Sequence, residues 1–530
     1  MVEVQQRVLI ACLAAGFAAL APKAAEARRF YPDDPIDTDC MPLPVGKPSK
    51  RKEVALFDFL NQSRNPKARS DKPAGAVNTL GEVPDSMWFT NRHARKRMTA
   101  EELKRGPGNE YAPRPPYWVV GAKIDGITPG FRMKDSAGRL YFVKPDPSSN
   151  PEMSTAADVI GSKAFYALGY FTPENHIVYV QRAQLKIAPE ARVAGVAGRQ
   201  RPMSERDLDQ ILINVPRTKD GSIRMLASHG LAGEVLGPFK FEGMRRDDPN
   251  DVVPHEDRRD LRGLAIMCAW LNHTDAKAGN TLDTIVEEYG IRVIRHHLID
   301  FGAILGSDSD MAKNARFGHE YVVPEKGQIF RRMASLGLFT TPWERADYPS
   351  DRAVGRFESK IFDPEKWVSN YPNPAFVSRR PDDEYWGAKQ VMAFTDADIR
   401  ALVSTGQYSD ERTAAYISRT LAERRDKIGR AYFLKVLALD HFAVDNGELK
   451  FTDLAVKHGF APDRRYDVTW TLFDNEKETH SPIAAANSFL LPKAAPNEYL
   501  AAKIQAAGDP KKTVTVYING TRVVGLDRAW

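Results

Sequence analysis

The spacing of apolar residues changes along the chain and divides it into an irregular part and three patterned parts. Between residues 116 and 180, short apolar runs alternate with turn residues, which predicts strands around one helix. From residue 255 to about residue 440, apolar positions recur every three to four residues, as on core-facing helices. Beyond residue 446 the period is two, and Asn519-Gly520 between two apolar runs predicts a hairpin. Residues 28–115 follow neither period, so we expect a loop-rich extension there.

The first patterned part predicts the order strand, turn, strand, helix, strand. The predicted strands are Tyr117–Ile124, Leu140–Lys144 and His176–Val180. Thr155–Leu168 carries apolar residues at helical spacing, and Gly169 is a typical helix terminator.

Residues 181–254 have a mixed pattern. Ser204 precedes a short predicted helix with acidic residues in its first turn. Strands near Ile223–Leu226 and Pro238–Phe241 are expected to pair as a hairpin.

The helical part contains three predicted helices. The first covers about 256–271, the second begins after Thr395 as its N-cap, and the third runs from about Asp410 to Leu439. In the last part of the chain, Tyr466–Phe473 alternates apolar and polar residues, as in a half-buried strand.

The N-terminus has the pattern of a secretory signal peptide. A basic residue precedes the apolar run Val8–Ala21, and the small-residue motif Ala25-Glu26-Ala27 follows it. The run is too short to span a bilayer comfortably. We therefore expect residues 1–27 to be removed, which leaves an exported, periplasmic or secreted chain that starts at Arg28 and has no transmembrane span. Two alternatives stay open, a buried N-terminal helix and a lipid anchor through Cys12.

The composition is that of a globular protein. Of 530 residues, 42% are hydrophobic and 27% are charged, so the chain can bury a core and is too long for one small domain. The net charge of +6 is small for this length, and the basic cluster Arg92–Arg97 lacks interleaved aromatic residues. We therefore expect no nucleic-acid partner. Outside the leader only Cys40 and Cys268 remain, which is no disulfide framework, although a bridge between them stays open.

The candidate chemistry follows the helix of 256–271. The segment His273-Thr274-Asp275-Ala276-Lys277-Ala278-Gly279-Asn280 has the form H-x-D-x-K-x-x-N, and Asp300-Phe301-Gly302 follows it. Lys144 lies upstream, at the end of a predicted strand. The loop and a nearby Asp-Phe-Gly are very rare together by chance, and in this chain they follow a strand lysine and a helix.

These residues resemble the catalytic loop and the metal-binding turn of the protein-kinase superfamily. The resemblance covers about residues 116–440 and is to atypical exported members, similar in style to HipA-type kinases, spore-coat (CotH) kinases and secreted animal kinases. It implies an α+β, bilobal protein-kinase-like fold, with an N-lobe and insertion over 116–254 and a helical C-lobe over 255–445. The loop-rich extension and a small C-terminal β domain, 446–530, lie outside the resemblance.

The resemblance also implies roles for individual residues. Asp275 would orient the acceptor hydroxyl and take its proton, and Lys277 would offset charge on the transferred phosphate. Asn280 and Asp300 supply the hard oxygen ligands that Mg²⁺ or Mn²⁺ prefers. Lys144 would hold the α- and β-phosphates of ATP.

Two parts of the expected nucleotide site stay open. The lysine needs an acidic partner, for which we favour Glu152 over Asp158 because it reaches further. Gly126 and Gly130 would let the backbone approach the phosphates, but this glycine turn lacks the G-x-G-x-x-G spacing and also fits an ordinary hairpin turn.

The leading hypothesis is an exported atypical kinase that transfers a phosphoryl group from a Mg-nucleotide to a hydroxyl of a protein or sugar acceptor. Two observations keep other interpretations open. The Ala-Pro-Glu that normally follows a kinase activation segment is missing between Gly302 and Thr395. Exported compartments of the bacterial type also hold little ATP. The alternatives are nucleotidyl transfer by the same residues and a pseudokinase scaffold or binding protein of the cell envelope.

Overall fold

The computed structural model describes residues 28–39, 41–52, 55–64, 70–108, 112–122, 129–194, 199–288, 290–323, 334 and 340–530. Their internal contacts define two units. The β unit comprises Leu439–Thr452, Arg464–Ala529 and the described residues up to Pro35. The large unit comprises Ile36–Ala438, Asp453–Asp463 and Trp530. The two expected kinase lobes thus fall within one unit, and the boundary at residue 254 stays a prediction.

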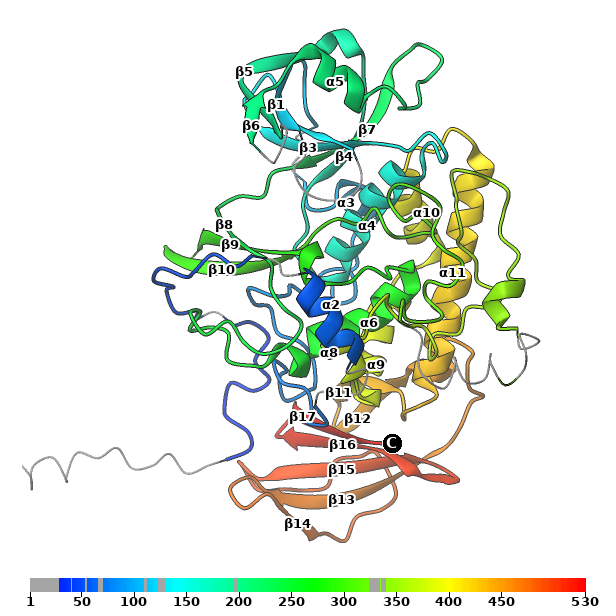
Figure 1. The fold of residues 1–530 in the computed structure, drawn as a ribbon. Coiled ribbons are helices and arrows are strands. Elements are labelled where there is room, and N and C mark those ends of the chain that lie inside the picture. Colours follow the sequence, from blue (N-terminus) through cyan, green and yellow to red (C-terminus); the bar gives the residue numbers. More distant parts are fainter. Residues whose placement is uncertain are drawn as a thin grey trace, which may run out of the picture. The chain divides into compact units, whose positions relative to one another are not determined.

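The strands of the first patterned part belong to a seven-stranded sheet (Figure 1). Its strand order is β4-β7-β3-β2-β1-β5-β6, with β1 and β5 parallel and all other neighbours antiparallel. Inward-facing residues such as Val119, Met133 and Ile223 form its core together with Leu208. The elements are β1 (Tyr117–Ala122), β2 (Phe131–Lys134), β3 (Leu140–Pro145), β4 (Asn175–Val180), η1 (Arg182–Gln184), β5 (Leu185–Ala194), β6 (Gln200–Pro202), α5 (Glu205–Ile211) and β7 (Ile223–His229).

Helix α4 (Met153–Leu168) joins this sheet to the helical half of the large unit. It contacts β3, β4 and β7 as well as helices of the C-terminal half, so nearly all of its side chains are buried. Gly169 ends the helix at φ 120°, and a side chain there would clash with the ring of Phe89. The prediction of a helix ended by Gly169 is confirmed, and the helix begins two residues earlier than expected.

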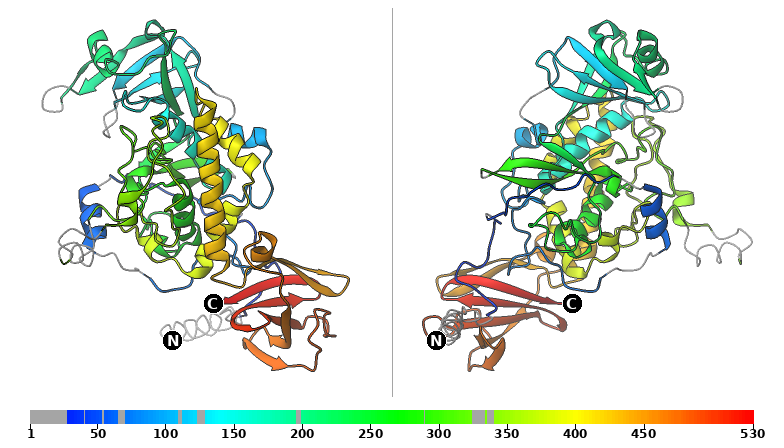
Figure 2. Two further views of the ribbon diagram at one scale, coloured as in Figure 1. Left: turned by 90° about the vertical axis from the view of Figure 1, so that its right-hand side faces the viewer. Right: turned by 60° about the vertical axis from the view of Figure 1, so that its left-hand side comes forward.

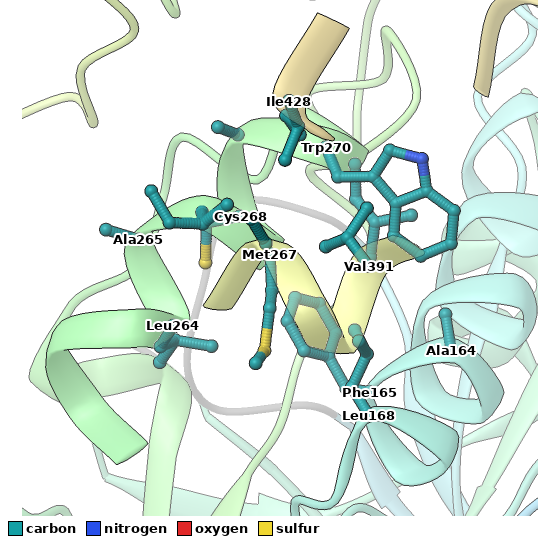
Figure 3. Packing of buried hydrophobic residues seen from close by; sticks show 14 of the residues in the cluster. Ala164, Phe165, Leu168, Leu264, Ala265, Met267, Cys268, Trp270, Val391 and Ile428 are labelled. Carbon is teal, nitrogen blue, oxygen red and sulfur yellow. The ribbon is translucent and has the colours of Figure 1, made fainter. Parts of the chain in front are cut away.

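The helical half packs around α6 (Arg259–Leu271), all of whose residues are buried. Figure 3 shows side chains of α6 packed against Phe165 of α4, Val391 of α9 (Pro381–Met392) and Ile428 of α11 (Glu411–Phe433). The further helices are η3 (His255–Asp257), η4 (Ala278–Asn280), η5 (Pro342–Arg345), α8 (Pro374–Val377), α10 (Asp396–Ser404) and α12 (Leu454–Lys457).

Capping residues correctly predicted where α10 and α11 begin, but the predicted end of α11 was not found. Thr395 caps α10 and forms a capping box with Asp398, as expected. Asp410 caps α11 by accepting from the backbone of Arg412. The expected extension of α11 to Leu439 is wrong, because the helix ends at Phe433 and Leu439 begins a strand.

A separate three-stranded sheet contains β8 (Glu234–Gly237), β9 (Thr281–Glu288) and β10 (Ile291–Leu298), in the order β10-β9-β8. The expected hairpin between Ile223–Leu226 and Pro238–Phe241 is wrong. β7 belongs to the seven-stranded sheet. The next strand, β8, ends at Gly237, whose φ is 98°. Beyond it the Phe239 N–H donates to the Thr281 hydroxyl instead of to a strand neighbour.

The N-terminal extension has little regular structure, as expected, apart from α2 (Ala55–Arg64) and α3 (Ala100–Arg105). It covers the helical core with two aromatic side chains. Trp88 stacks on His296 of β10 with ring centroids 3.5 Å apart, and Phe89 meets the edge of Trp386 at 5.4 Å.

The β unit contains a five-stranded antiparallel sheet in the order β14-β13-β15-β16-β17 (Figure 2). The predicted Asn519-Gly520 hairpin is confirmed, since Asn519 pairs with Arg522 at the turn. Phe30 of the extension packs on this sheet against Phe473 and Tyr517. The unit starts at Leu439, seven residues before the expected boundary. Its strands are β11 (Leu439–Asp445), β12 (Glu448–Asp453), β13 (Tyr466–Asp474), β14 (Thr479–Pro482), β15 (Tyr499–Ala506), β16 (Asp509–Asn519) and β17 (Arg522–Ala529).

Some expectations concern residues outside the described part. They include the leader 1–27, with the alternative anchor Cys12, and the bridge between Cys40 and Cys268, of which Cys40 is not described. Cys268 is a buried free thiol. Within the described ranges, no helix is both long and apolar enough to cross a membrane.

The contact between α6 and α9 depends on a glycine and is therefore sensitive to one added methyl group. A Cβ at Gly263 would lie 2.5 Å from the buried ring of Trp386. We expect Gly263→Ala to lower the free energy of unfolding by about 1–3 kcal/mol, as overpacking does. Urea denaturation measures this. Gly46→Ala is the matched control, because a Cβ there meets nothing within 4 Å; an equal loss in both variants would contradict the prediction.

Candidate active site

Lys144 and Asp300 meet at the junction of the seven-stranded sheet and the helical half. The Nζ of Lys144, near the end of β3, donates to Asp300 Oδ1 at 2.7 Å and lies 3.9 Å from Asp158 Oδ2 on α4. Burial alone lowers the pKa of Lys144, but the two carboxylates outweigh it and raise the pKa above its ordinary value. The lysine is therefore a fixed cation between two acids.

Asp158 also holds the Asp-Phe-Gly turn against α4. Its Oδ1 accepts from the backbone N–H of Phe301 at 2.8 Å. The Phe301 ring is fully buried and stacks on Phe165 of the same helix, with centroids 5.2 Å apart. Asp300 itself has φ 59°, a left-handed conformation that turns the chain sharply before Phe301. One carboxylate thus positions both the lysine and the turn.

The expected pair of Lys144 with Glu152 is wrong, and the alternative Asp158 takes that place. Glu152 stands at the N-cap of α4 with φ 68°, and its Oε2 accepts from the backbone N–H of Ser409 at 2.9 Å. The longer side chain is therefore turned toward the segment before α11. Asp158 lies one and a half turns into the helix, on the face that meets β3.

The catalytic-loop motif follows directly from the end of α6. Asn272 caps this helix in a left-handed conformation, φ 55°, which reverses the chain into the loop. His273 is buried between Phe165 and Phe301, at ring distances of 5.7 and 6.1 Å. Burial lowers the pKa of His273 to about 4, so the ring is neutral at pH 7 and acts as a packing residue.

Of the remaining three motif residues, Lys277 and Asn280 both contact Asp275. Lys277 Nζ lies 3.1 Å from Asp275 Oδ2. The Asn280 side-chain amide donates to the backbone carbonyl of Asp275 at 2.8 Å and to its Oδ2 at 3.0 Å. The Tyr371 hydroxyl lies 3.5 Å from Asp275 Oδ1. The predicted grouping of Asp275, Lys277 and Asn280 is thus present.

The loop and the Asp-Phe-Gly are joined through the β9–β10 hairpin. Asn280 precedes the first residue of β9, and the Ile299 N–H donates to the Asn280 carbonyl at 3.0 Å. Thr281 pairs with Leu298 in the ladder. Because the residues that follow Asn280 and precede Asp300 pair in one ladder, Asn280 and Asp300 are held at the same end of the β9–β10 hairpin.

The donor set fits a hard divalent cation whose coordination is completed by a nucleotide. The amide nitrogen of Asn280 faces Asp275, and in the described part of the chain no hydrogen bond reaches its Oδ1. Among the described residues, no three His, Cys, Asp or Glu side chains converge as a metal centre. Mg²⁺ typically takes only one or two protein carboxylates and obtains its other ligands from phosphate and water. Asn280 and Asp300 are the residues that would hold it.

Three further polar residues at the site belong to none of the sequence motifs. Lys313 is 1% exposed, and its Nζ donates to the Thr274 hydroxyl at 2.9 Å and to the Ala303 carbonyl at 3.0 Å. Burial raises the pKa of Asp308, which interacts electrostatically with Asp275 and Lys277. The third is Tyr371, whose pKa burial also raises. They come from the irregular segments after the Asp-Phe-Gly, where spacing predicts nothing.

The expected glycine turn lies only partly within the described part of the chain. Gly126 lies outside the described residues, and Gly130 directly precedes β2. A role of either glycine at the phosphates stays a prediction.

No protein-family model matches the sequence, and no curated protein matches it either. Among solved structures, a crystal structure of the Golgi casein kinase is 9% identical and aligns over 75% of this chain and 94% of that one, with a TM-score of 0.30. A second structure of the Golgi casein kinase, with Mn/ADP bound, is 11% identical over 75% and 95% of the two chains, also with a TM-score of 0.30. A likeness with a TM-score this low carries no argument about function.

The buried Lys313 predicts a specific pH dependence of stability. Burial lowers its pKa to about 8 from the ordinary 10.5, partly offset by Asp308 and Asp275. The folded chain therefore releases this proton at lower pH than the unfolded chain, and stability rises between pH 8 and 10.5. We expect the stability of wild type relative to Lys313→Met to increase over this range by about 3 kcal/mol. Urea unfolding at pH 7.5 and pH 10.5 measures the difference; a constant difference would contradict it.

Proposed function

We propose that the protein transfers a phosphoryl group from a Mg-nucleotide to a hydroxyl acceptor. One observation carries this proposal: the strand lysine Lys144 pairs with Asp300 of the Asp-Phe-Gly, while the Asp275–Asn280 loop is bonded to the strand end just before that aspartate. Positioning and neutralisation of charge are what phosphoryl transfer requires of a protein. The arrangement supplies both from groups far apart in the sequence.

Each residue has a role that its surroundings support. Lys144 is a permanent cation for the α- and β-phosphates, and Asp158 keeps it in place. Asp275 accepts the proton of the acceptor hydroxyl, and Lys277 beside it offsets charge on the transferred phosphoryl oxygens. A Mg²⁺ ion held by Asn280 and Asp300 supplies further neutralisation of the phosphate oxygens.

Labelled nucleotide distinguishes this reaction from its alternatives. The protein is incubated with Mg²⁺ or Mn²⁺ and either γ- or α-labelled ATP, with candidate protein and sugar acceptors. Label transferred only from the γ-position supports the kinase proposal. Transfer of the α-label identifies a nucleotidyl transferase instead, and binding of Mg-ATP without transfer of either label identifies a pseudokinase.

We also propose that the chain is exported, on the pattern of residues 1–27. Mass spectrometry of the protein recovered from its native host checks this, with Arg28 expected as the first residue. A lipid-modified N-terminus at Cys12 would favour the anchored alternative. Retention of the leader in the cytoplasm would refute export and would also remove the objection that exported compartments lack ATP.

Asp275 and Asp300 should differ in what they affect. Asp275→Asn removes the proton acceptor but keeps the amide contacts, so we expect intact Mg-ATP binding and a loss of turnover of about 10²–10⁴-fold. Asp300→Ala removes a metal ligand and the partner of Lys144, so binding should be lost as well. Calorimetric titration with Mg-ATP and single-turnover assays separate the two effects. Full turnover by Asp275→Asn would refute its role.

The corrected lysine pair predicts an order of effects for two acidic residues. Asp158→Asn removes a carboxylate beside Lys144 and weakens the acceptor for the Phe301 N–H, so kcat/KM for ATP should fall strongly. Glu152→Gln keeps an acceptor for Ser409 and serves as the matched control, with activity near wild type. Steady-state kinetics at saturating acceptor measure both, and a larger loss in Glu152→Gln would restore the original assignment.

A further inference from the structure

A cavity of about 180 Å³ lies within the large unit, beneath the N-terminal extension. Its wall combines residues of the extension, the segment before α6 and strand β10. Apolar side chains such as Val77, Pro84 and Val253 form one part of the wall. This volume is far larger than one water molecule needs and smaller than a typical drug-sized pocket.

Three buried polar side chains form the other part of the wall, and each is only half satisfied. Asp248, Arg258 and His296 are each 4% exposed. Asp248 Oδ1 accepts from Asn250, Arg258 donates through Nε and Nη2 to Asp260, and His296 Nδ1 lies 2.7 Å from an oxygen of Asp283.

The second polar atom of each group has no partner among the described residues. Across the described ranges, no hydrogen bond reaches Asp248 Oδ2, Arg258 Nη1 or His296 Nε2. None of the three atoms is sealed inside the protein, so each is open to the cavity and can form a hydrogen bond with a ligand there. Burial also raises the pKa of Asp248, which the hydrogen bonds from Asn250 and the nearby His296 only partly offset.

Trp88 holds two of these groups in place. The His296 ring stacks on it at 3.5 Å and 14°, and the Arg258 guanidinium lies 4.4 Å from the centroid of the Trp88 ring. Their side chains therefore cannot turn away to find other partners. The wall is preorganised before any ligand binds.

We propose that this cavity binds a small polyhydroxylated molecule, of the size between glycerol and a monosaccharide. One wall atom is an acceptor, one is a donor and the histidine nitrogen acts as either, and a hydroxyl group matches all three because it both donates and accepts. A phosphate or other anion is disfavoured, since Asp248 lines the wall and Asp260 already occupies Arg258. A lone metal ion is disfavoured too, since Asp248 is the only buried carboxylate among the described residues of the wall.

The cavity is separate from the proposed active site but shares a hairpin with it. His296 lies on β10, four residues before Asp300, and its partner Asp283 lies on β9, three residues after Asn280. The binding proposal does not depend on the kinase proposal.

Calorimetric titration tests binding with glycerol, inositol and a panel of neutral hexoses and pentoses as probes. We expect saturable binding of at least one polyol to the full chain, weakened about tenfold or more in Asp248→Ala. Val77→Phe, which fills the apolar wall, should weaken the same binding. Glu287→Gln, at an exposed position of β9, is the control and should bind as wild type.

The outcomes are decisive in both directions. Circular dichroism first confirms that each variant is folded. Binding of no polyol by folded wild type, or binding that neither cavity variant weakens, overturns the proposal. Selective binding of free amino acids or of inorganic phosphate, tested as further probes, overturns the assigned ligand class. Activity with labelled ATP is measured separately, so failure of one proposal leaves the other standing.

Discussion

A single lysine buried between two carboxylates constrains the whole large unit. Asp158 is almost fully buried, and Lys144 supplies the charge opposite to both Asp158 and Asp300. Removing a charged partner from such a cluster leaves an uncompensated buried charge, which is costly. Strand β3, helix α4 and the Asp-Phe-Gly turn must therefore assemble together. The near-complete burial of α4 is the packing counterpart of this charge constraint.

Much of the fold was predictable wherever a local chemical signal defines an element. Thr395 and Asp410 cap their helices, Gly169 ends α4, and Asn519-Gly520 forms its hairpin, because caps and tight turns depend on a few neighbouring residues. The failures concern pairing between distant segments. Phe239 looked like a strand residue by its apolar neighbours, but its N–H is bound by a threonine side chain forty-two residues away.

At the candidate site, too, local contacts were predictable from the sequence and contacts between distant segments were not. The motif spacing predicted Asp275, Lys277 and Asn280 as one group, since the loop is local and its contacts lie within five residues. The choice between Glu152 and Asp158 depended on the direction of the Glu152 side chain at the N-cap of α4, which reach alone does not determine. Lys313 and Asp308 come from an irregular segment, so only the three-dimensional structure brings them to the catalytic loop.

The hairpin of β9 and β10 has a consequence for how this site can diversify. Its two strands pair in unbroken register from Thr281 and Leu298 outward to Glu288 and Ile291. The spacing of the two proposed metal ligands is therefore set at one end of the ladder alone. Each strand is eight residues long, so the loop at the opposite end is free to vary in length. Insertions there, or a grafted recognition loop, would extend the protein toward new partners while the ligand geometry is kept.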